Sequence, residues 1–138
     1  MKNTYYYNNQ KLRTSNNIYT HALISMKDGQ ICLWACCGRY DLALKRYNQE
    51  LNDAIKGKAY NEELLNEVAN GTYKTWGHDS KGNYCRCKEV TAEELAKAKA
   101  YIEESLARCE RIIKTLQIVE LERKEGKKNE SFINHGTL

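Results

Sequence analysis

The chain has 138 residues, of which 41% are hydrophobic and 29% charged, and its formal net charge at pH 7 is +4. These values are typical of a folded protein and exclude a disordered chain. The apolar runs are too short for a membrane-spanning helix, and residues 1–20 are too polar for a secretory signal. The modest basic bias lacks the dense stripe of a DNA- or RNA-binding protein, so we expect neither a membrane nor a nucleic acid as partner. The length predicts a single α+β domain over residues 1–125, followed by a loosely ordered tail over 126–138.

Two β-hairpins are predicted near the N-terminus. Tyr5 to Thr14 alternate around the polar turn Asn8-Asn9-Gln10. Ile18 to Met26 and Gln30 to Cys37 then flank Asp28-Gly29, a pair that favours the positive φ angles of a tight hairpin turn.

A two-residue turn at Asp28-Gly29 fixes the register of this second hairpin. The expected pairs are Met26 with Ile31, Ser25 with Cys32, Ile24 with Leu33, Leu23 with Trp34, Ala22 with Ala35 and His21 with Cys36. Both faces are partly apolar, so we expect the hairpin to lie centrally and to be covered on both sides.

The middle of the chain predicts two helices. Apolar residues at helical spacing indicate a first helix from about Tyr40 to Lys56, with Gly57 in the positive-φ position just past its end. A shorter acidic helix is expected from Asn61 to Ala69, ending near Gly71. A third hairpin should follow, with strands at Thr72–Trp76 and Tyr84–Val90.

The last predicted helix starts at Thr91-Ala92-Glu93-Glu94, a capping box in which Thr91 and Glu94 satisfy each other's backbone amides. Apolar residues recur behind it every three or four positions as far as Leu116, and the pattern allows the helix to continue to Lys124. Such a helix would be roughly 50 Å long, whereas a compact domain of this size is roughly 40 Å across. We therefore infer that its end projects and mediates homo-oligomerisation, unless the helix breaks near Gln117. The expected fold is thus α+β, an antiparallel sheet of hairpins with a mid-chain helix and a long C-terminal helix.

The cysteines do not match a disulfide framework or a common zinc site. They lack a Cys-x-x-Cys spacing, and without a secretory signal we expect reduced thiols that act as small apolar fillers. The six residues are Cys32, Cys36, Cys37, Cys85, Cys87 and Cys109. We expect neither a metal nor another cofactor.

No catalytic motif is evident in the sequence. Its three histidines have no convergent acid, base or nucleophile at a recognisable spacing, and phosphate-binding glycine loops and nucleophile elbows are lacking. A dyad of His21 and Cys36 across the second hairpin is sterically feasible, but cross-strand neighbours of this kind are common in cores. The sequence therefore favours a protein that is not an enzyme.

The third hairpin is the better candidate for a binding site. Tyr73, Trp76 and Tyr84 offer aromatic faces, with Lys74, Arg86 and Lys88 interleaved. Stacking of one nucleobase on an aromatic side chain is worth about 1–3 kcal/mol, and an arginine adds a forked phosphate contact. The same aromatic residues would also serve as ordinary core.

Two arginines, Arg108 and Arg111, lie about one turn apart beside the apolar seam of the last helix. On a projecting helix they would face a neighbouring subunit, where an arginine binds either phosphate or a carboxylate such as Glu104.

The order of these elements resembles that of the phage Thoeris anti-defence proteins of the first described type, which act as nucleotide sponges. The residues that carry the resemblance are the N-terminal YYYN hairpin, the segment from Ile18 to the Asp28-Gly29 turn, the helix RYDLALKRYNQEL, the Thr-Tyr-x-x-Trp hairpin and the Thr-Ala-Glu-Glu start of the long helix. Together they cover most of residues 5–120.

The resemblance implies a phage-encoded protein that acts in the cytoplasm of its bacterial host. Such proteins form homo-oligomers up to hexamers and sequester a cyclic ADP-ribose isomer without cleaving it, and some also capture the cyclic oligonucleotides of CBASS defence. Their pocket lies between subunits and uses an aromatic residue, a polar residue near the start of the long helix and an arginine further along it. Here these correspond to Trp76 (or Tyr73), to Thr91 in place of an asparagine-like residue, and to Arg108. Lys56 or Lys58 would supply a further basic group.

Two other functions remain as alternatives. An anti-CRISPR-like inhibitor would act by contact with a protein or a nucleic acid, and a nucleotide hydrolase would destroy the signal rather than hold it.

Overall fold

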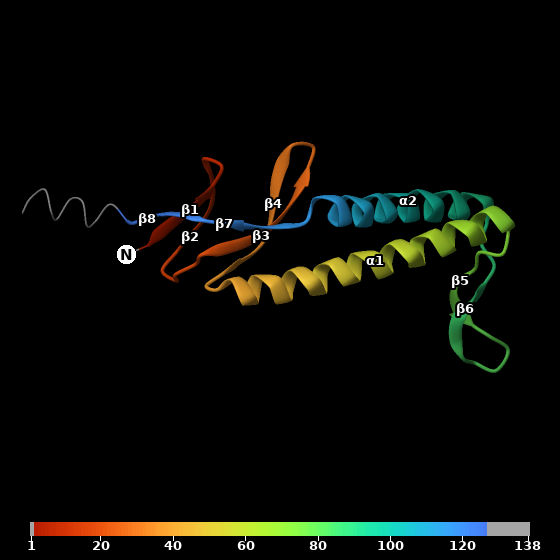
Figure 1. The fold of residues 1–138 in the computed structure, drawn as a ribbon. Coiled ribbons are helices and arrows are strands. Elements are labelled where there is room, and N and C mark those ends of the chain that lie inside the picture. Colours follow the sequence, from red (N-terminus) through yellow and green to blue (C-terminus); the bar gives the residue numbers. More distant parts are fainter. Residues whose placement is uncertain (1, 127–138) are drawn as a thin grey trace, which may run out of the picture. The chain divides into compact units, whose positions relative to one another are not determined.

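The computed structural model describes residues 2–126 and has an α+β fold of antiparallel hairpins with two helices (Figure 1). The elements are β1 (Asn3–Tyr7), β2 (Gln10–Ser15), β3 (His21–Lys27), β4 (Gln30–Cys37), α1 (Tyr40–Asn70), β5 (Thr75–His78), β6 (Tyr84–Lys88), α2 (Ala92–Thr115), β7 (Gln117–Glu120) and β8 (Glu122–Lys124). Over residues 2–126, neither helix has an apolar stretch long enough to cross a membrane. Apart from residue 126 itself, the tail predicted over 126–138 lies outside the described residues.

The chain divides into two compact units. The first takes its described residues from Met1–Leu51 and Lys114–Leu138 and contains two three-stranded sheets, with strand orders β2-β1-β8 and β4-β3-β7. The second unit is Asn52–Ile113, which contains the later part of α1, the β5–β6 hairpin and nearly all of α2.

The N-terminal hairpin forms as predicted. Asn8 and Asn9 both have positive φ angles, 53° and 64°, as a two-residue turn between twisted strands requires. Tyr5 at the centre of β1 is fully buried, and its hydroxyl donates a 2.6 Å hydrogen bond to the carbonyl of Asn17 and accepts one from the amide of Tyr19. These bonds hold the chain that leaves β2 against β1.

The second hairpin turns at Asp28 and Gly29, whose φ angles are 52° and 77°, so this prediction is confirmed. The predicted pairs hold from the turn as far as Ile24 with Leu33. A register shift between Leu23 and Ile24 then makes the remaining three predicted pairs wrong by one residue on β4. The observed pairs are Leu23 with Ala35, Ala22 with Cys36 and His21 with Cys37.

Only one strand of this hairpin is central. β3 pairs with β4 on one side and with β7 on the other, and residues 22–25 are buried. Within the described chain β4 is an edge strand, and its residues after Gln30 are half-buried, so the expectation that both strands lie centrally is wrong for β4.

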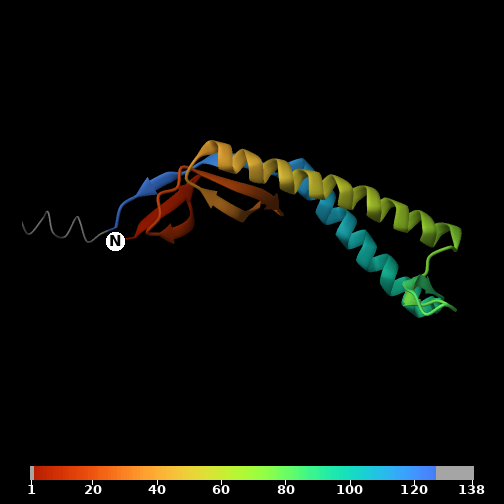
Figure 2. The ribbon, with the colours of Figure 1, turned by 90° about the horizontal axis from the view of Figure 1, so that it is seen from below.

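The mid-chain helix is one helix and not two. α1 runs unbroken for 31 residues, as Figure 2 shows, and the predicted end at Lys56 is wrong. Gly57 lies inside α1, where an added Cβ would come within 2.9 Å of the Cys109 Sγ atom of α2. Glycine therefore permits a close approach of the two helices, and the side-chain amide of Asn61 donates a 2.8 Å hydrogen bond to the Gly57 carbonyl. The predicted end near Gly71 is confirmed, since α1 ends at Asn70 and the φ angle of Gly71 is 74°.

The last helix is shorter than predicted. α2 has 24 residues, roughly 36 Å, and ends at Thr115 instead of Lys124. Residues Gln117–Glu120 instead form β7, which pairs with β3. The Thr115 hydroxyl accepts a 3.0 Å hydrogen bond from the amide of Met26, which places the helix end beside the sheet. The length argument for a projecting helix therefore fails.

The third hairpin forms between α1 and α2 in the chain, but its predicted bounds are partly wrong: β5 begins three residues later than predicted and extends to His78, and β6 ends at Lys88 instead of Val90. The capping box is confirmed: the Thr91 amide donates to Oε1 of Glu94 over 3.0 Å, and the Glu94 amide donates to Oγ1 of Thr91 over 3.1 Å.

Candidate functional site

The β5–β6 hairpin carries an exposed aromatic cluster on one face. The register opposes His78 to Tyr84 and Trp76 to Arg86, which places these four side chains on the same side. The Trp76 and Tyr84 rings are stacked with centroids 5.3 Å apart and planes inclined by 22°, and the His78 ring lies 5.1 Å from that of Tyr84. Trp76 is 53% exposed and Tyr84 64%, so this stack offers aromatic surface to solvent.

Arg86 ties the hairpin to the end of α1. Its Nη2 atom donates a 2.9 Å hydrogen bond to Glu67, and its Nε atom donates to the carbonyl of Lys74. The guanidinium carbon also lies 5.0 Å from the centre of the Tyr73 ring. The hydrogen bond to Glu67 is the main cause that raises the pKa of Arg86 above its ordinary value. Arg86 and Tyr73 therefore already hold each other in place, and this leaves the guanidinium little freedom to grip a phosphate.

Thr91 stands where the hairpin leads into α2. Its oxygen accepts the amide proton of Glu94, and a side-chain hydrogen bond between Thr91 and the Glu94 carboxylate helps to lower the pKa of that carboxyl. The Thr91 side chain is therefore engaged in capping α2, which argues against it as a ligand contact.

The remaining predicted site residues lie on the helices, away from the hairpin. Arg108 is exposed on α2, about 24 Å along the axis from the first residue of that helix. Among residues 2–126 it forms neither an ion pair nor a hydrogen bond. The alternative in which Arg108 pairs with the Glu104 carboxylate is therefore wrong. Arg111 is half-buried, and Lys56 is exposed on α1 next to Gly57, which approaches Cys109.

The predicted site residues thus form two groups within one copy of the chain. The hairpin group contains Tyr73, Trp76, Tyr84, Arg86 and Thr91, and the helix group contains Lys56, Arg108 and Arg111. Sequence reasoning missed His78, which it assigned to the loop although the residue ends β5, and Glu67, the partner of Arg86. Alternation from Trp76 would have placed His78 on the aromatic face, whereas nothing local to Glu67 pairs it with a residue 19 positions away.

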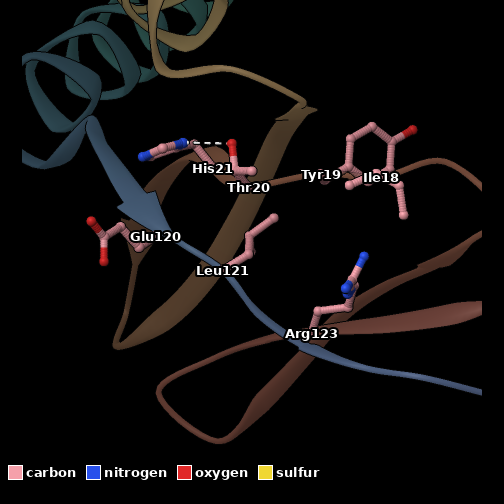
Figure 3. Close-up of a pocket in the computed structure, with 7 residues that line it drawn as sticks. All are labelled: Ile18, Tyr19, Thr20, His21, Glu120, Leu121 and Arg123. Carbon is pink, nitrogen blue, oxygen red and sulfur yellow. Dashed lines mark hydrogen bonds between the residues drawn. The ribbon is translucent and has the colours of Figure 1, made fainter.

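A cavity in the first unit shares no residue with either group. It measures about 420 Å³ and opens where the segment after β2 passes the connection from β7 to β8. In the view of Figure 3, His21 and Glu120 lie on one side of Leu121, and Tyr19 and Arg123 lie on the other. Its remaining lining residues are Ile18 and Thr20.

Among residues 2–126 no group of three or more His, Cys, Asp or Glu side chains is arranged to hold a metal ion. Comparison of the chain with protein-family models, with curated proteins and with solved structures found no match.

Proposed function

We propose that this protein is a phage-encoded sponge, which binds a cyclic ADP-ribose-type signalling nucleotide in the cytoplasm of the host bacterium and holds it without cleavage. The proposal takes its ligand class from the resemblance described above. The observation that carries it is the exposed stack of Trp76 and Tyr84, because a half-exposed tryptophan suits a nucleobase.

The ligand would need one aromatic platform and separate cations. A cyclic ADP-ribose has one adenine and two phosphates, so adenine would stack on the free face of Trp76. Arg86 is engaged by Glu67, and this makes Arg108 and Lys56 the better phosphate contacts, since both are exposed. Thr91 would contact the ligand only by giving up its side-chain hydrogen bond with Glu94.

A complete site of this kind would form between two copies of the chain. Arg108 lies about 24 Å along α2 from the helix start that follows the hairpin, so we propose that Arg108 of a second copy, rather than of the same copy, meets Trp76. Exposed apolar side chains on both helices of the second unit support self-association, which we propose to reach up to a hexamer. They are Ile55, Tyr60 and Tyr101.

The decisive experiment separates binding from turnover. The protein is incubated with a panel of cyclic ADP-ribose isomers and CBASS cyclic oligonucleotides, freed of unbound ligand, heated, and the released material identified by mass spectrometry. We expect one cyclic nucleotide to be retained and returned intact. Release of an altered product would mean that the protein is a hydrolase and not a sponge. If no cyclic nucleotide is retained, the favoured function becomes an inhibitor that acts by contact with a macromolecule.

Two variants locate the site. Trp76→Ala and Arg108→Gln should each reduce retention by at least about tenfold, since each removes a contact worth about 1.4 kcal/mol or more. Leu42→Ala and Lys99→Gln are the matched controls, because they remove an exposed apolar and an exposed cationic side chain elsewhere on the helices. Unchanged retention by Trp76→Ala and Arg108→Gln would show that the ligand binds at another place.

A further inference from the structure

The cavity of the first unit is built where two chain segments pass side by side between its sheets. Residues 18–20 lead from β2 in one sheet to β3 in the other, and Leu121 links β7 back to β8. The Leu121 amide donates a 2.9 Å hydrogen bond to the carbonyl of Thr20, which fixes the two crossings against each other. The cavity therefore belongs to the fold itself, with a volume of about 420 Å³ that suits a small molecule.

Two charges of opposite sign line this cavity without neutralising each other. Glu120 and Arg123 both reach it, and within the described part of the chain neither forms an ion pair. Three steps of extended chain separate them, or roughly 10 Å between their Cα atoms. Leu121 supplies apolar surface between the two ends, and Ile18 lies beside Tyr19 at the basic end (Figure 3).

The basic end is reinforced by a second arginine. Arg13 on β2 and Arg123 on β8 both stand opposite Tyr5 of β1, so their side chains leave the sheet on the same face. The Tyr19 ring packs edge-on against Tyr5, with centroids 5.3 Å apart. Hydrogen bonds from Asn17 and Ser15, together with Arg13, hold the pKa of the Tyr19 phenol below its ordinary value. These groups together stabilise negative charge.

The acidic end has its own polar neighbour. Glu120 stands opposite His21 across β7 and β3, and the His21 Nδ1 atom is hydrogen-bonded to the Thr20 hydroxyl over 2.8 Å. Within residues 2–126 no ion pair or hydrogen bond engages the Glu120 carboxylate, so it can accept hydrogen bonds from a ligand.

We propose that this cavity binds an amphoteric small molecule, with a carboxylate or phosphate at Arg123, a protonated amine at Glu120 and an apolar body over Leu121. This site is separate from the nucleotide site proposed on the β5–β6 hairpin. Because both charges are exposed, each contact is partly screened by water and the affinity for a minimal ligand is modest.

The test uses three probes that share an apolar chain and differ in their ends. They are ε-aminocaproate with both charges, caproate with the carboxylate alone and hexylamine with the ammonium alone. We expect amide resonances of residues 18–21 and 120–123 in the full chain to shift saturably with ε-aminocaproate, and each singly charged probe to bind about fivefold more weakly. Equal affinity for all three probes, or no saturable shift with ε-aminocaproate, would overturn the proposal.

Variants then assign the two ends. Arg123→Gln should reduce the affinity for ε-aminocaproate to that of hexylamine, and Glu120→Gln should reduce it to that of caproate. Arg39→Gln is the control, because it removes an arginine of the same unit that is exposed and paired with Asp41 instead. Wild-type affinity in both cavity variants would refute the assignment. Retention of cyclic nucleotides should be unchanged in these variants, so this proposal and the sponge can fail independently.

Discussion

The Glu94 carboxylate shows how one residue makes the stability of a helix depend on pH. The hydrogen bond that this carboxylate accepts from the Thr91 amide, together with a side-chain hydrogen bond with Thr91, holds the pKa of Glu94 below its ordinary value of 4.5, since both favour the ionised form. A carboxylate whose pKa is lower in the folded state stabilises that state above the unfolded pKa. This contribution is lost as the pH falls through the folded pKa.

Glu94→Gln tests this dependence, because glutamine keeps an oxygen that can cap the Thr91 amide but cannot ionise. We expect the free energy of unfolding to fall less steeply for Glu94→Gln than for the wild type between about pH 5 and pH 3. Urea unfolding across this range measures the difference. Glu93→Gln, which removes an exposed carboxylate from the same turn, is the control, and identical slopes for Glu94→Gln and the wild type would contradict the prediction.

Arg86 and Glu67 form an ion pair that connects the hairpin to α1. Their side chains are 24% and 27% exposed, so the pair is better shielded than a fully solvated one. A double-mutant cycle with Arg86→Ala and Glu67→Ala should give a coupling energy of about 1 kcal/mol. Hydrogen exchange should also become faster in β5 and β6 in either single variant. Additive effects, with unchanged exchange in the hairpin, would mean that the pair does not anchor it.

At the scale of elements, Gly57 is the residue whose local signal predicts two helices where the structure has the single helix α1. Glycine with an acidic segment behind it is typical of a helix end, yet α1 continues for 13 residues beyond Gly57. The reason is tertiary: the absent Cβ makes room for Cys109, a residue that local patterns cannot pair with Gly57. The signals that act within a few residues, namely the two hairpin turns, the Gly71 stop and the capping box, were all predicted.

Gly57→Ala distinguishes the packing role of this glycine from its poor helix propensity. In an open helix the change would stabilise by about 1 kcal/mol. Here we expect net destabilisation, because overpacking costs about 1–3 kcal/mol and the nearest atom is only 2.9 Å from the added Cβ. Thermal unfolding measures the effect, and Cys109→Ala in the same chain should recover most of the loss. A stabilising Gly57→Ala change would show that the helices separate at this point.

The end of α2 and the register of β3 could not be predicted for a similar reason. The apolar spacing that runs to Leu116 fits a longer helix, but residues 118–119 are also β-branched and fit a strand beside β3. The apolar pattern alone cannot decide between a longer helix and a strand that pairs with β3. The candidate site shows the same limit. The aromatic face of the hairpin can be predicted from the alternation of side chains along a strand. The ion pair of Arg86 with Glu67, and the position of Arg108 away from the hairpin, depend on packing between elements and cannot.

At the scale of the whole molecule, the proposed sponge requires that the hairpin residues and the helix residues of one site come from different copies of the chain. If Trp76 of one copy and Arg108 of another complete each site, a chain lacking Trp76 and a chain lacking Arg108 can complement one another. In a two-fold pair made from one of each, one site carries both substitutions and the other carries neither.

Co-refolding Trp76→Ala and Arg108→Gln chains in equal amounts should therefore restore retention of the cyclic nucleotide, although each variant alone retains almost none. For random two-fold pairing, about a quarter of the wild-type capacity is expected. Equilibrium dialysis against the nucleotide measures this capacity, and mixing either variant with itself is the control. A mixture with no more capacity than its components would mean that the two residues act in the same chain or that only one contacts the ligand. Either result would remove the intersubunit site from the proposal while leaving the aromatic platform of the hairpin to be tested alone.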